Sequence, residues 1–380
     1  MILVTITKNE ETTLPRLLAS TRDHVRRAMI FDTGSTDDTF NVAARANASV
    51  ERITFSNFSH ARNAAIRAAE GTVGVQDEYL LLLDADMTLE VSDPAWKGQL
   101  TADLGMVKLI EGDLEYRLPL IRRVGCGLWY SGFTHEALET PANRFQLVEG
   151  IAVYHHADGG SRADKYQRDL ILLRQQLEAN PGDPRATYYL ARTHWCLGDL
   201  QKAAQTFWAR WKMSGGWEEE RWHAGLCYAR CVASVGQDDV RPIFLEVWAQ
   251  RPDRSEPIAD LMRQVDPPFR ARLADLIRGH RPPADAVLFV EPAAYSAAER
   301  HDWLQARDAG SWGIADRIAI AAVRDKLAPR TWWYRALIQS AWNCGRTIEA
   351  LEWAEKGLAL VPGDEGLLHD KAAMLAANGS

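Results

Sequence analysis

The chain has 380 residues, which suits two or three domains better than a single core. Its hydrophobic fraction of 47% and charged fraction of 25% are ordinary for a folded globular protein and argue against disorder. A net charge of −7 does not support a broad basic face for nucleic acid, and no apolar run reaches the roughly 18 residues of a membrane span.

The cysteines and the N-terminus bear on the compartment. The five cysteines are odd in number and form no CxxC pair, so reduced thiols are expected rather than a disulfide framework. Residues from Met1 enter an apolar stretch at once, without a basic leader or a cleavage site, and we expect no signal peptide. Both observations favour a cytoplasmic location.

Short apolar strands alternate with helical patterns in the first 90 residues. This alternation predicts parallel βαβ units, hence an α/β, Rossmann-like domain over residues 1–165 whose ligands bind outside the carboxyl ends of the strands. A serine cap is expected at the start of the third helix. The expected strands are Ile2–Thr7, Ala28–Asp32, Val50–Thr54 and Tyr79–Asp84, and the expected helices are Glu11–Thr21, Asp37–Ala46 and Ser59–Glu70.

The chain changes character near residue 165, after which the pattern is helical. Twelve of the fourteen tryptophans follow this point, as expected where stacked helical hairpins bury large aromatic residues. Gly198 and Gly345, each followed five residues later by an alanine, fit tetratricopeptide spacing, and Gly236 fits it more loosely. We therefore expect tetratricopeptide-like repeats over 166–280, then a connector over Arg281–Pro292 and further repeats within 281–380.

Distinctive polar residues fall at the ends of the expected strands. Thr7 and Glu10 follow the first strand, and Asp84 and Asp86 follow the fourth. Alternation along an extended chain would put these two aspartates on one side, where a divalent cation bridging two phosphates needs such a pair. A lone DxD triplet is usually a loop or a helix cap, but its place after a fourth parallel strand favours a metal site.

Two further stretches supply candidates for the same cleft. Asp32 leaves the second strand and could accept hydrogen bonds from a base or ribose, while Ser35 or Thr36 could cap the helix that follows. Arg62 and Asn63, near the start of the third helix, could supply a cation and an amide. Taken alone, Arg62 would more often be a solvated helix charge.

Four ordered motifs resemble the signature of family 2 glycosyltransferases with a GT-A fold. They are Thr5–Glu11, Asp32–Thr39, Phe58–Ala65 and Leu83–Asp86, and the likeness covers roughly the first 160 residues. The C-terminal half resembles the tetratricopeptide extension of one bacterial and phage branch of that family, at Asp169–Leu173, Tyr189–Arg192 and Arg251–Pro257.

The resemblance implies a role for each matching residue on the donor side. Glu10 and Asp32 would contact the nucleoside, Arg62 would lie near the nucleotide or its phosphates, and Asp84 would approach the ribose and the metal. Asp86 would ligate the metal, usually Mn²⁺ or Mg²⁺. A later histidine would complete the site, and the doublet His155-His156 leaves that choice open with a slight preference for His155; a loop histidine without a ligand role is the alternative.

The acceptor side is implied by Gly132–Glu136, which is similar to the His-Glu element of related transferases. Inverting transfer needs a carboxylate near the acceptor to remove its proton. Glu136 is the candidate base, and His135 would orient it or the acceptor. A glutamate that caps a helix or forms a salt bridge is an equal alternative.

The resulting hypothesis is a metal-dependent inverting hexosyl- or pentosyltransferase that uses a UDP-sugar or another nucleotide sugar. Its acceptor would be a peptide, protein, glycan or modified DNA base, and the repeats could present the acceptor or hold a homodimer together. The alternative is a tetratricopeptide interaction scaffold with a degenerate transferase domain. Chemically competent residues at every donor-site position favour the enzyme.

Overall fold

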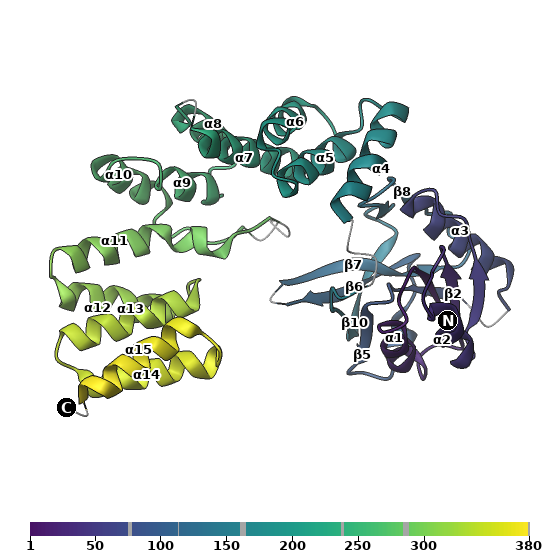
Figure 1. Ribbon diagram of the computed structural model, residues 1–380, viewed down its shortest axis with the longest axis horizontal. Coiled ribbons are helices and arrows are strands. Elements are labelled where there is room, and N and C mark those ends of the chain that lie inside the picture. The colour runs from purple at the N-terminus through teal and green to yellow at the C-terminus, as the bar shows by residue number, and fades with distance from the viewer. Residues whose placement is uncertain (75–77, 113, 160–164, 237–238, 284–288, 379–380) are drawn as a thin grey trace. The chain divides into compact units, whose positions relative to one another are not determined.

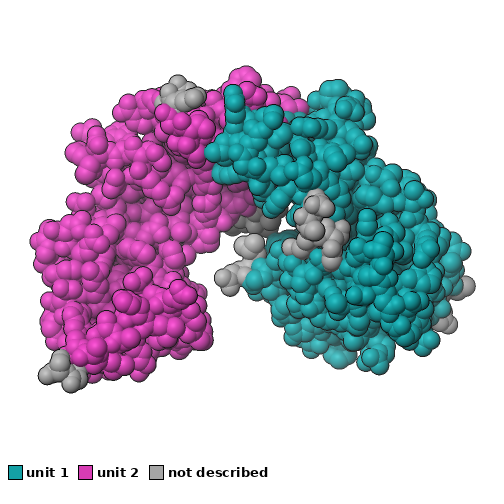
Figure 2. Space-filling view, viewed as in Figure 1, with its two compact units in different colours: residues 1–203 teal, residues 204–380 magenta. Residues whose placement is uncertain are grey.

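The computed structural model describes residues 1–74, 78–112, 114–159, 165–236, 239–283 and 289–378. The chain divides into two compact units, Met1–Ala203 and Ala204–Ser380 (Figure 2). The first unit extends past residue 165 and includes the first helical hairpin. Within the described ranges, no helix is both long and apolar enough to cross a membrane.

A twisted mixed sheet forms the centre of the first unit (Figure 1). Its strand order is β3-β2-β1-β4-β7-β6-β10-β5 among the described residues, and a separate short pair, β8 and β9, lies outside it. The strands are β1 (Ile2–Thr7), β2 (Arg27–Asp32), β3 (Ser49–Arg52), β4 (Tyr79–Leu82), β5 (Met87–Val91), β6 (Leu104–Glu111), β7 (Leu114–Arg123), β8 (Tyr130–Ser131), β9 (Ala137–Leu138) and β10 (Phe145–His155).

The four strands expected from the sequence pair in parallel, and antiparallel strands join them to form the rest of the sheet. β1 pairs in parallel with β2 and β4, and β2 pairs in parallel with β3. β7 is antiparallel to both β4 and β6, and β5 is antiparallel to β10. After the DxD triplet, β6 and β7 form a hairpin and β10 pairs in parallel with β6. The sequence made no prediction for the strands of this half.

The sheet is covered on both faces, which explains its continuous apolar strands. Side chains of a strand alternate between the faces, so Leu3 and Leu81 enter one hydrophobic cluster while Ile2 and Leu80 enter the other. All four residues of β4 are buried. A strand buried on both faces reads as an unbroken apolar run, which is the pattern that precedes Asp84.

Three helices connect the parallel strands: α1 (Leu14–Thr21), α2 (Thr39–Arg45) and α3 (Phe58–Gly71). The cap of α3 is Asn57 rather than a serine, because the Asn57 side chain accepts a hydrogen bond from the His60 backbone N at 2.8 Å. Ser35 and Thr36 do not cap α2 either. That helix begins later, and the backbone N of Ser35 instead donates to Asp32 Oδ1 at 3.0 Å.

All described elements from residue 165 onward are helical. A 3-10 turn, η1 (Trp96–Gln99), lies within the sheet region, and a second, η3 (Pro292–Ser296), precedes α11. The helices are α4 (Lys165–Ala179), α5 (Pro184–Cys196), α6 (Leu200–Lys212), α7 (Glu218–Val235), α8 (Arg241–Gln250), α9 (Glu256–Leu261), α10 (Pro267–Ile277), α11 (Ala297–Asp308), α12 (Trp312–Arg324), α13 (Arg330–Asn343), α14 (Thr347–Leu360) and α15 (Glu365–Asn378).

The expected repeat pattern marks helical hairpins. Gly198, Gly236 and Gly345 each follow a helix with φ between 64° and 79°, a backbone conformation that favours glycine. Ala203 and Ala350, on the helices after two of these turns, are fully buried. The expected connector Arg281–Pro292 is only partly visible, since residues 284–288 lie outside the described part of the chain.

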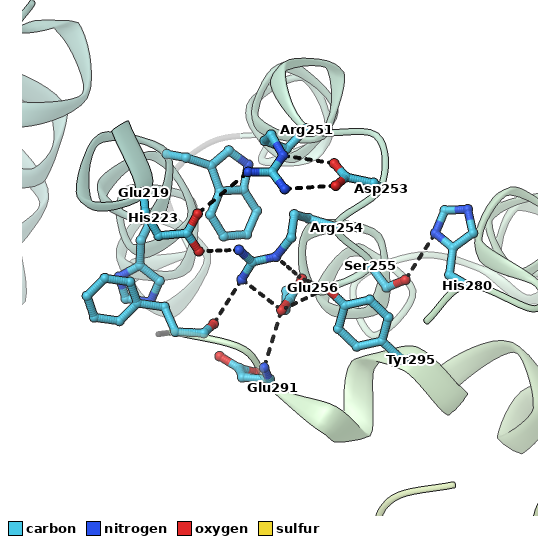
Figure 3. A network of polar contacts seen from close by, with 12 residues as sticks. Glu219, His223, Arg251, Asp253, Arg254, Ser255, Glu256, His280, Glu291 and Tyr295 are labelled. Carbon is cyan, nitrogen blue, oxygen red and sulfur yellow. Dashed lines mark hydrogen bonds and ion pairs between the residues drawn. The ribbon is translucent and has the colours of Figure 1, made fainter. Parts of the chain in front are cut away.

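A buried polar network stands at the centre of the second unit (Figure 3). Arg254, fully buried, lies between Glu219 and Glu256; its Nε and Nη2 donate to the Glu256 carboxylate at 3.2 and 3.0 Å. The Tyr295 hydroxyl donates to Glu256 at 3.1 Å, and Arg254 Nη2 donates to the Phe289 carbonyl at 3.1 Å. The network therefore connects α7, α9 and η3.

Candidate active site

A cavity of about 250 Å³ lies where β1, α3 and the turn after β4 meet in the first unit. This is the carboxyl end of the parallel strands, where α/β sheets bind ligands. Six of the residues expected at the site line it together: Thr7, Glu10, Arg62, Asp84, Asp86 and His155. The folding of the sheet thus brings residues almost 150 positions apart into one site.

The DxD triplet reaches the cavity by a different geometry from the one its sequence suggests. β4 ends at Leu82, and the backbone N of Met87 donates to the Asp84 carbonyl at 3.1 Å, so the triplet forms a turn rather than an extended strand. Alternation along a strand therefore does not explain why both aspartates line the cavity. The turn places Asp84 toward Arg62 and Asp86 toward His155.

Arg62 joins the two sides of the site. Its Nη1 lies 2.8 Å from Asp84 Oδ1, and its Nε donates to Glu136 Oε1 at 2.5 Å. Burial alone would lower the pKa of Arg62, but Asp84 and Glu136 raise it well above its ordinary value. One permanently charged guanidinium therefore holds two carboxylates that lie 52 positions apart in the sequence. The Tyr130 ring lies beside it, 5.4 Å from the guanidinium to the ring centroid.

Asp86 and His155 form the second charged pair of the cavity. His155 Nε2 lies 3.3 Å from Asp86 Oδ2, and its Nδ1 lies 3.3 Å from Glu111 Oε2. The hydrogen bond to Asp86 raises the pKa of His155 against the opposing effect of burial. The neighbouring His156 points elsewhere, with Nε2 2.9 Å from Thr88 Oγ1.

Glu10 is held close to Asp86 at the rim of the cavity. Its Oε2 accepts a hydrogen bond from Thr13 Oγ1 at 2.5 Å. A side chain at Gly159 would place its Cβ 3.0 Å from Glu10 Oε1 and 3.1 Å from Asp86 Oδ2. The absence of a side chain at Gly159 therefore lets the chain pass close to both carboxylates.

The remaining expected residues lie outside the cavity lining. Asp32 is buried and accepts a hydrogen bond from the Ser35 backbone. Asn63 uses both ends of its amide on the Tyr130 backbone, at 2.8 and 2.9 Å. Glu136 reaches the cavity only through Arg62, and the His135 ring stacks on Tyr189 with ring centroids 4.0 Å apart.

Three cationic residues line the cavity that the motif reasoning missed. Lys8 directly follows Thr7, and Lys165 and Arg168 come from the first turn of α4. A basic pair three residues apart, soon after the candidate histidine loop, was the available signal. This pair lies at and beyond residue 165, where the expected domain ends, so the strand-end motifs do not include it.

The site and fold define an α/β domain with a polar ligand cavity, followed by helical repeats. Residues 2–94 match the family model described as glycosyl transferase family 2. This match lies within the α/β domain, whose fold is of the GT-A type, and the helical part that follows is tetratricopeptide-like.

Relatives and solved structures share parts of this arrangement. The chain is 41% identical over 88 residues to a TPR repeat-containing protein of Synechococcus elongatus, a match that spans 23% of this chain and 20% of that relative. The S. aureus TarS fragment 1–349 is 14% identical, with a TM-score of 0.33, over 76% of this chain and 94% of that fragment. Yeast Tom70 is 17% identical, with a TM-score of 0.44, over 58% and 44% of the two chains.

Proposed function

We propose that this protein transfers a hexosyl or pentosyl group, with inversion, from a nucleotide-diphosphate sugar to an acceptor, and that it depends on Mn²⁺ or Mg²⁺. The observation that carries the proposal is the cavity in which Asp84, Asp86, Arg62 and His155 meet within the family 2 domain and the strands beside it. Acidic and basic groups together suit a metal-bound diphosphate.

The donor set of the cavity fits such a cation. Two ligands about 2.1 Å from one ion lie about 3 Å apart when they are adjacent. The 3.3 Å between Asp86 Oδ2 and His155 Nε2 is close to that spacing. No group of three or more His, Cys, Asp or Glu side chains among the described residues is arranged to hold an ion, so water and ligand oxygens would complete the shell. A bound cation would neutralise charge on the departing diphosphate.

His155 rather than His156 is the proposed ligand beside Asp86. Its imidazole lies on the cavity, whereas that of His156 is directed to Thr88. Asp84 is proposed to share the metal and approach the ribose, since its side chain is 35% exposed and faces the same space.

The nucleoside would occupy the end of the cavity near β1. Thr7 and Glu10 line that end, and we propose that Glu10 accepts hydrogen bonds from the nucleoside. Asp32 directly precedes Thr33, which lines the cavity and whose hydroxyl donates to the Thr7 carbonyl at 2.9 Å. We propose that Asp32 contributes by fixing this turn or by reaching the base, and that Asn63 contributes by fixing Tyr130.

On the acceptor side we propose Glu136 as the base. The Glu136 carboxylate is joined to the donor-side Asp84 through Arg62, which sets the distance between the two halves of the site. A carboxylate near the acceptor hydroxyl or amine removes its proton as the new bond forms at the anomeric carbon and the bond to the diphosphate breaks. His135 is proposed to orient this loop.

The direct test is turnover of a panel of UDP-, GDP- and dTDP-sugars with Mn²⁺ or Mg²⁺, measured as release of the nucleoside diphosphate. We expect one donor class to be hydrolysed slowly to water and faster with peptide, glycan or modified-DNA acceptors. Asp86→Asn should abolish the metal-dependent rate. Absence of both turnover and binding for every donor would instead favour an interaction scaffold.

A further inference from the structure

The loop that carries Glu136 is bonded to the first helical hairpin, α4 and α5, and all three belong to the first unit. The backbone N of Phe133 donates to Gln176 Oε1 at 2.6 Å. The Thr134 hydroxyl donates to Asp169 Oδ1 at 2.9 Å, and Arg185 Nε donates to the His135 carbonyl at 3.0 Å. Three successive loop residues are thus each fixed by one side chain of the hairpin.

These contacts are buried and directional. Asp169, Gln176 and Thr134 are 1%, 8% and 7% exposed, so leaving any of their polar groups without a partner would be costly. The amide of Gln176 has its orientation set from the other end, because its Nε2 donates to Asp183 Oδ2 at 2.7 Å. Asp183 in turn caps α5 by accepting from the Ala186 backbone. The hairpin therefore holds the loop through side chains whose own orientations are fixed.

The loop needs this support because its backbone is strained at His135. The φ of His135 is 50°, in the left-handed region that non-glycine residues rarely adopt. Such a conformation persists only when its surroundings enforce it. Burial first, and then the nearby cations Lys165, Arg192, Arg185 and Arg168, lower the pKa of His135 to about 3. A neutral imidazole therefore lies flat on Tyr189, with an angle of 10° between the rings.

The opposite side of the loop touches the donor site. The backbone N of Phe58, at the start of α3, donates to the Phe133 carbonyl at 2.9 Å. The same helix carries Arg62, which holds Glu136. The position of Glu136 relative to Asp84 is thus set by α3 on one side and by the α4–α5 hairpin on the other.

We infer that the α4–α5 hairpin is a built-in positioning element of the transferase, an inference that rests on the proposed function. Asp169, Gln176 and Arg185 are positioning residues that hold the Thr134–Glu136 segment so that Glu136 meets the acceptor. The inference gives a physical role to the motifs at Asp169 and Tyr189, which the donor site leaves unexplained. The first helices after the sheet are accordingly part of the enzyme, not a tether for a separate repeat domain.

The test compares Thr134→Val, Thr134→Ser and Thr193→Val in the full chain. Valine matches threonine in shape but removes the hydroxyl that Asp169 accepts from, whereas serine keeps it. Thr193 is the matched control, because its hydroxyl donates within α5 to the Tyr189 carbonyl at 2.9 Å rather than to the loop. The readout is kcat and donor KM for the nucleotide sugar that turns over in the panel.

We expect Thr134→Val to lower kcat about 10- to 100-fold, as a small misplacement of a catalytic group does, with donor KM changed less than about twofold. Thr134→Ser should restore most of the rate, and Thr193→Val should keep it. Equal kcat values for the valine and serine variants, or a loss confined to donor KM, would overturn the inference.

Amide hydrogen exchange provides a readout that does not need activity. In Thr134→Val the amides of residues 133–136 should exchange faster than in the wild type, while those of β1 stay unchanged. Unchanged exchange at 133–136 would show that the hairpin does not hold the loop. If wild-type protein turns over no nucleotide sugar, the proposed function fails, and the exchange result still decides the positioning by itself.

Discussion

Two arginines in this protein occupy the same kind of place, each between two carboxylates, yet their surroundings differ. In the first unit, Arg62 lies between Asp84 and Glu136, and the Asp84 side chain is 35% exposed toward the cavity. In the second unit, Arg254 and Glu256 are both 0% exposed, and the arginine donates to both carboxylates as well as to a backbone carbonyl. Both arginines form ion pairs, so ion pairing does not distinguish the two clusters. The exposure of Asp84 to the cavity does, and it makes the Arg62 cluster a candidate functional site and the Arg254 cluster a structural one.

The energetics of such clusters explain why one can be structural. A buried ion pair gains little over a well-packed apolar core, but removal of one partner leaves an uncompensated buried charge. In the second unit the remaining groups would have no access to water. In the first unit the open cavity gives the carboxylates solvent and, by the proposed function, a cation. Substitution of Arg254 should therefore lower the free energy of unfolding of the second unit, whereas substitution of Arg62 should lower the rate of turnover.

Arg254→Met should have the largest effect on stability. It leaves Glu256 buried without its cation, although Arg251 still lies 3.7 Å from Glu219, and we expect the free energy of unfolding of the second unit to fall by about 3–5 kcal/mol. Urea unfolding followed by circular dichroism measures this loss. Replacing Arg254, Glu219 and Glu256 together by apolar residues should recover much of it. A loss below about 1 kcal/mol for the single variant would remove the distinction between the two clusters.

Arg62→Met should act mainly on turnover. Without the guanidinium, Glu136 and Asp84 lose their common anchor, and we expect kcat for nucleotide-sugar turnover to fall about 100- to 1000-fold. Arg67→Met, on the same helix but packed on Trp129, is the control that should keep most of the rate. A full rate in Arg62→Met would show that the cluster is structural in this unit too.

His135, whose side chain is 30% exposed, gives a dependence on pH. Its pKa is about 3 in the folded protein and about 6.5 when unfolded, so the unfolded state binds more protons between these values. The first unit should therefore lose stability as pH falls from about 6.5 toward 3, by at most about 1.4 kcal/mol per pH unit from this residue. His135→Gln should have a shallower slope in urea unfolding across that window. Parallel slopes for the two proteins would contradict this assignment.

Gly159→Ala should have the smallest effect. The new Cβ would meet Glu10 and Asp86 at 3.0 and 3.1 Å, so both carboxylates must shift slightly. Overpacking of this size costs about 1 kcal/mol, and the Mn²⁺ concentration for half-maximal donor binding should rise about fivefold. Titration of Mn²⁺ at fixed nucleotide measures it, and an unchanged midpoint would show that the two carboxylates tolerate the displacement.

The sequence predicted the parallel half of the sheet well because its strands are apolar and separated by clear helices. It did not predict β6 and β7. β7 carries charged residues and Pro119, features that normally argue against an inner strand, and a register irregularity beside Gly105 accommodates the proline. The sequence predicted that Asp84, Asp86 and His155 lie at one site because each sits in a recognisable motif, and all three line the cavity. The contact between Arg62 and Glu136 was not, because it joins residues 74 positions apart and no local pattern records it.

The helical half shows the same limit. Glycines with positive φ follow the first helix of three hairpins, so these three turns could be predicted from the sequence. The hydrogen bonds from α4 and α5 to the loop at Thr134 could not be predicted from the sequence, because they depend on how the hairpin packs against the sheet. Division of the helical part near residue 280 stays a prediction.

The most direct test of the metal-dependent donor site compares two adjacent histidines. Thermal unfolding of the wild type, His155→Ala and His156→Ala should be measured with UDP, GDP or dTDP, with and without Mn²⁺, because a ligand that binds only the folded state raises the midpoint. We predict a nucleotide-induced shift that requires Mn²⁺ in the wild type and in His156→Ala, and that is lost in His155→Ala. A shift that is independent of Mn²⁺, or one that survives in His155→Ala and disappears in His156→Ala, would contradict it.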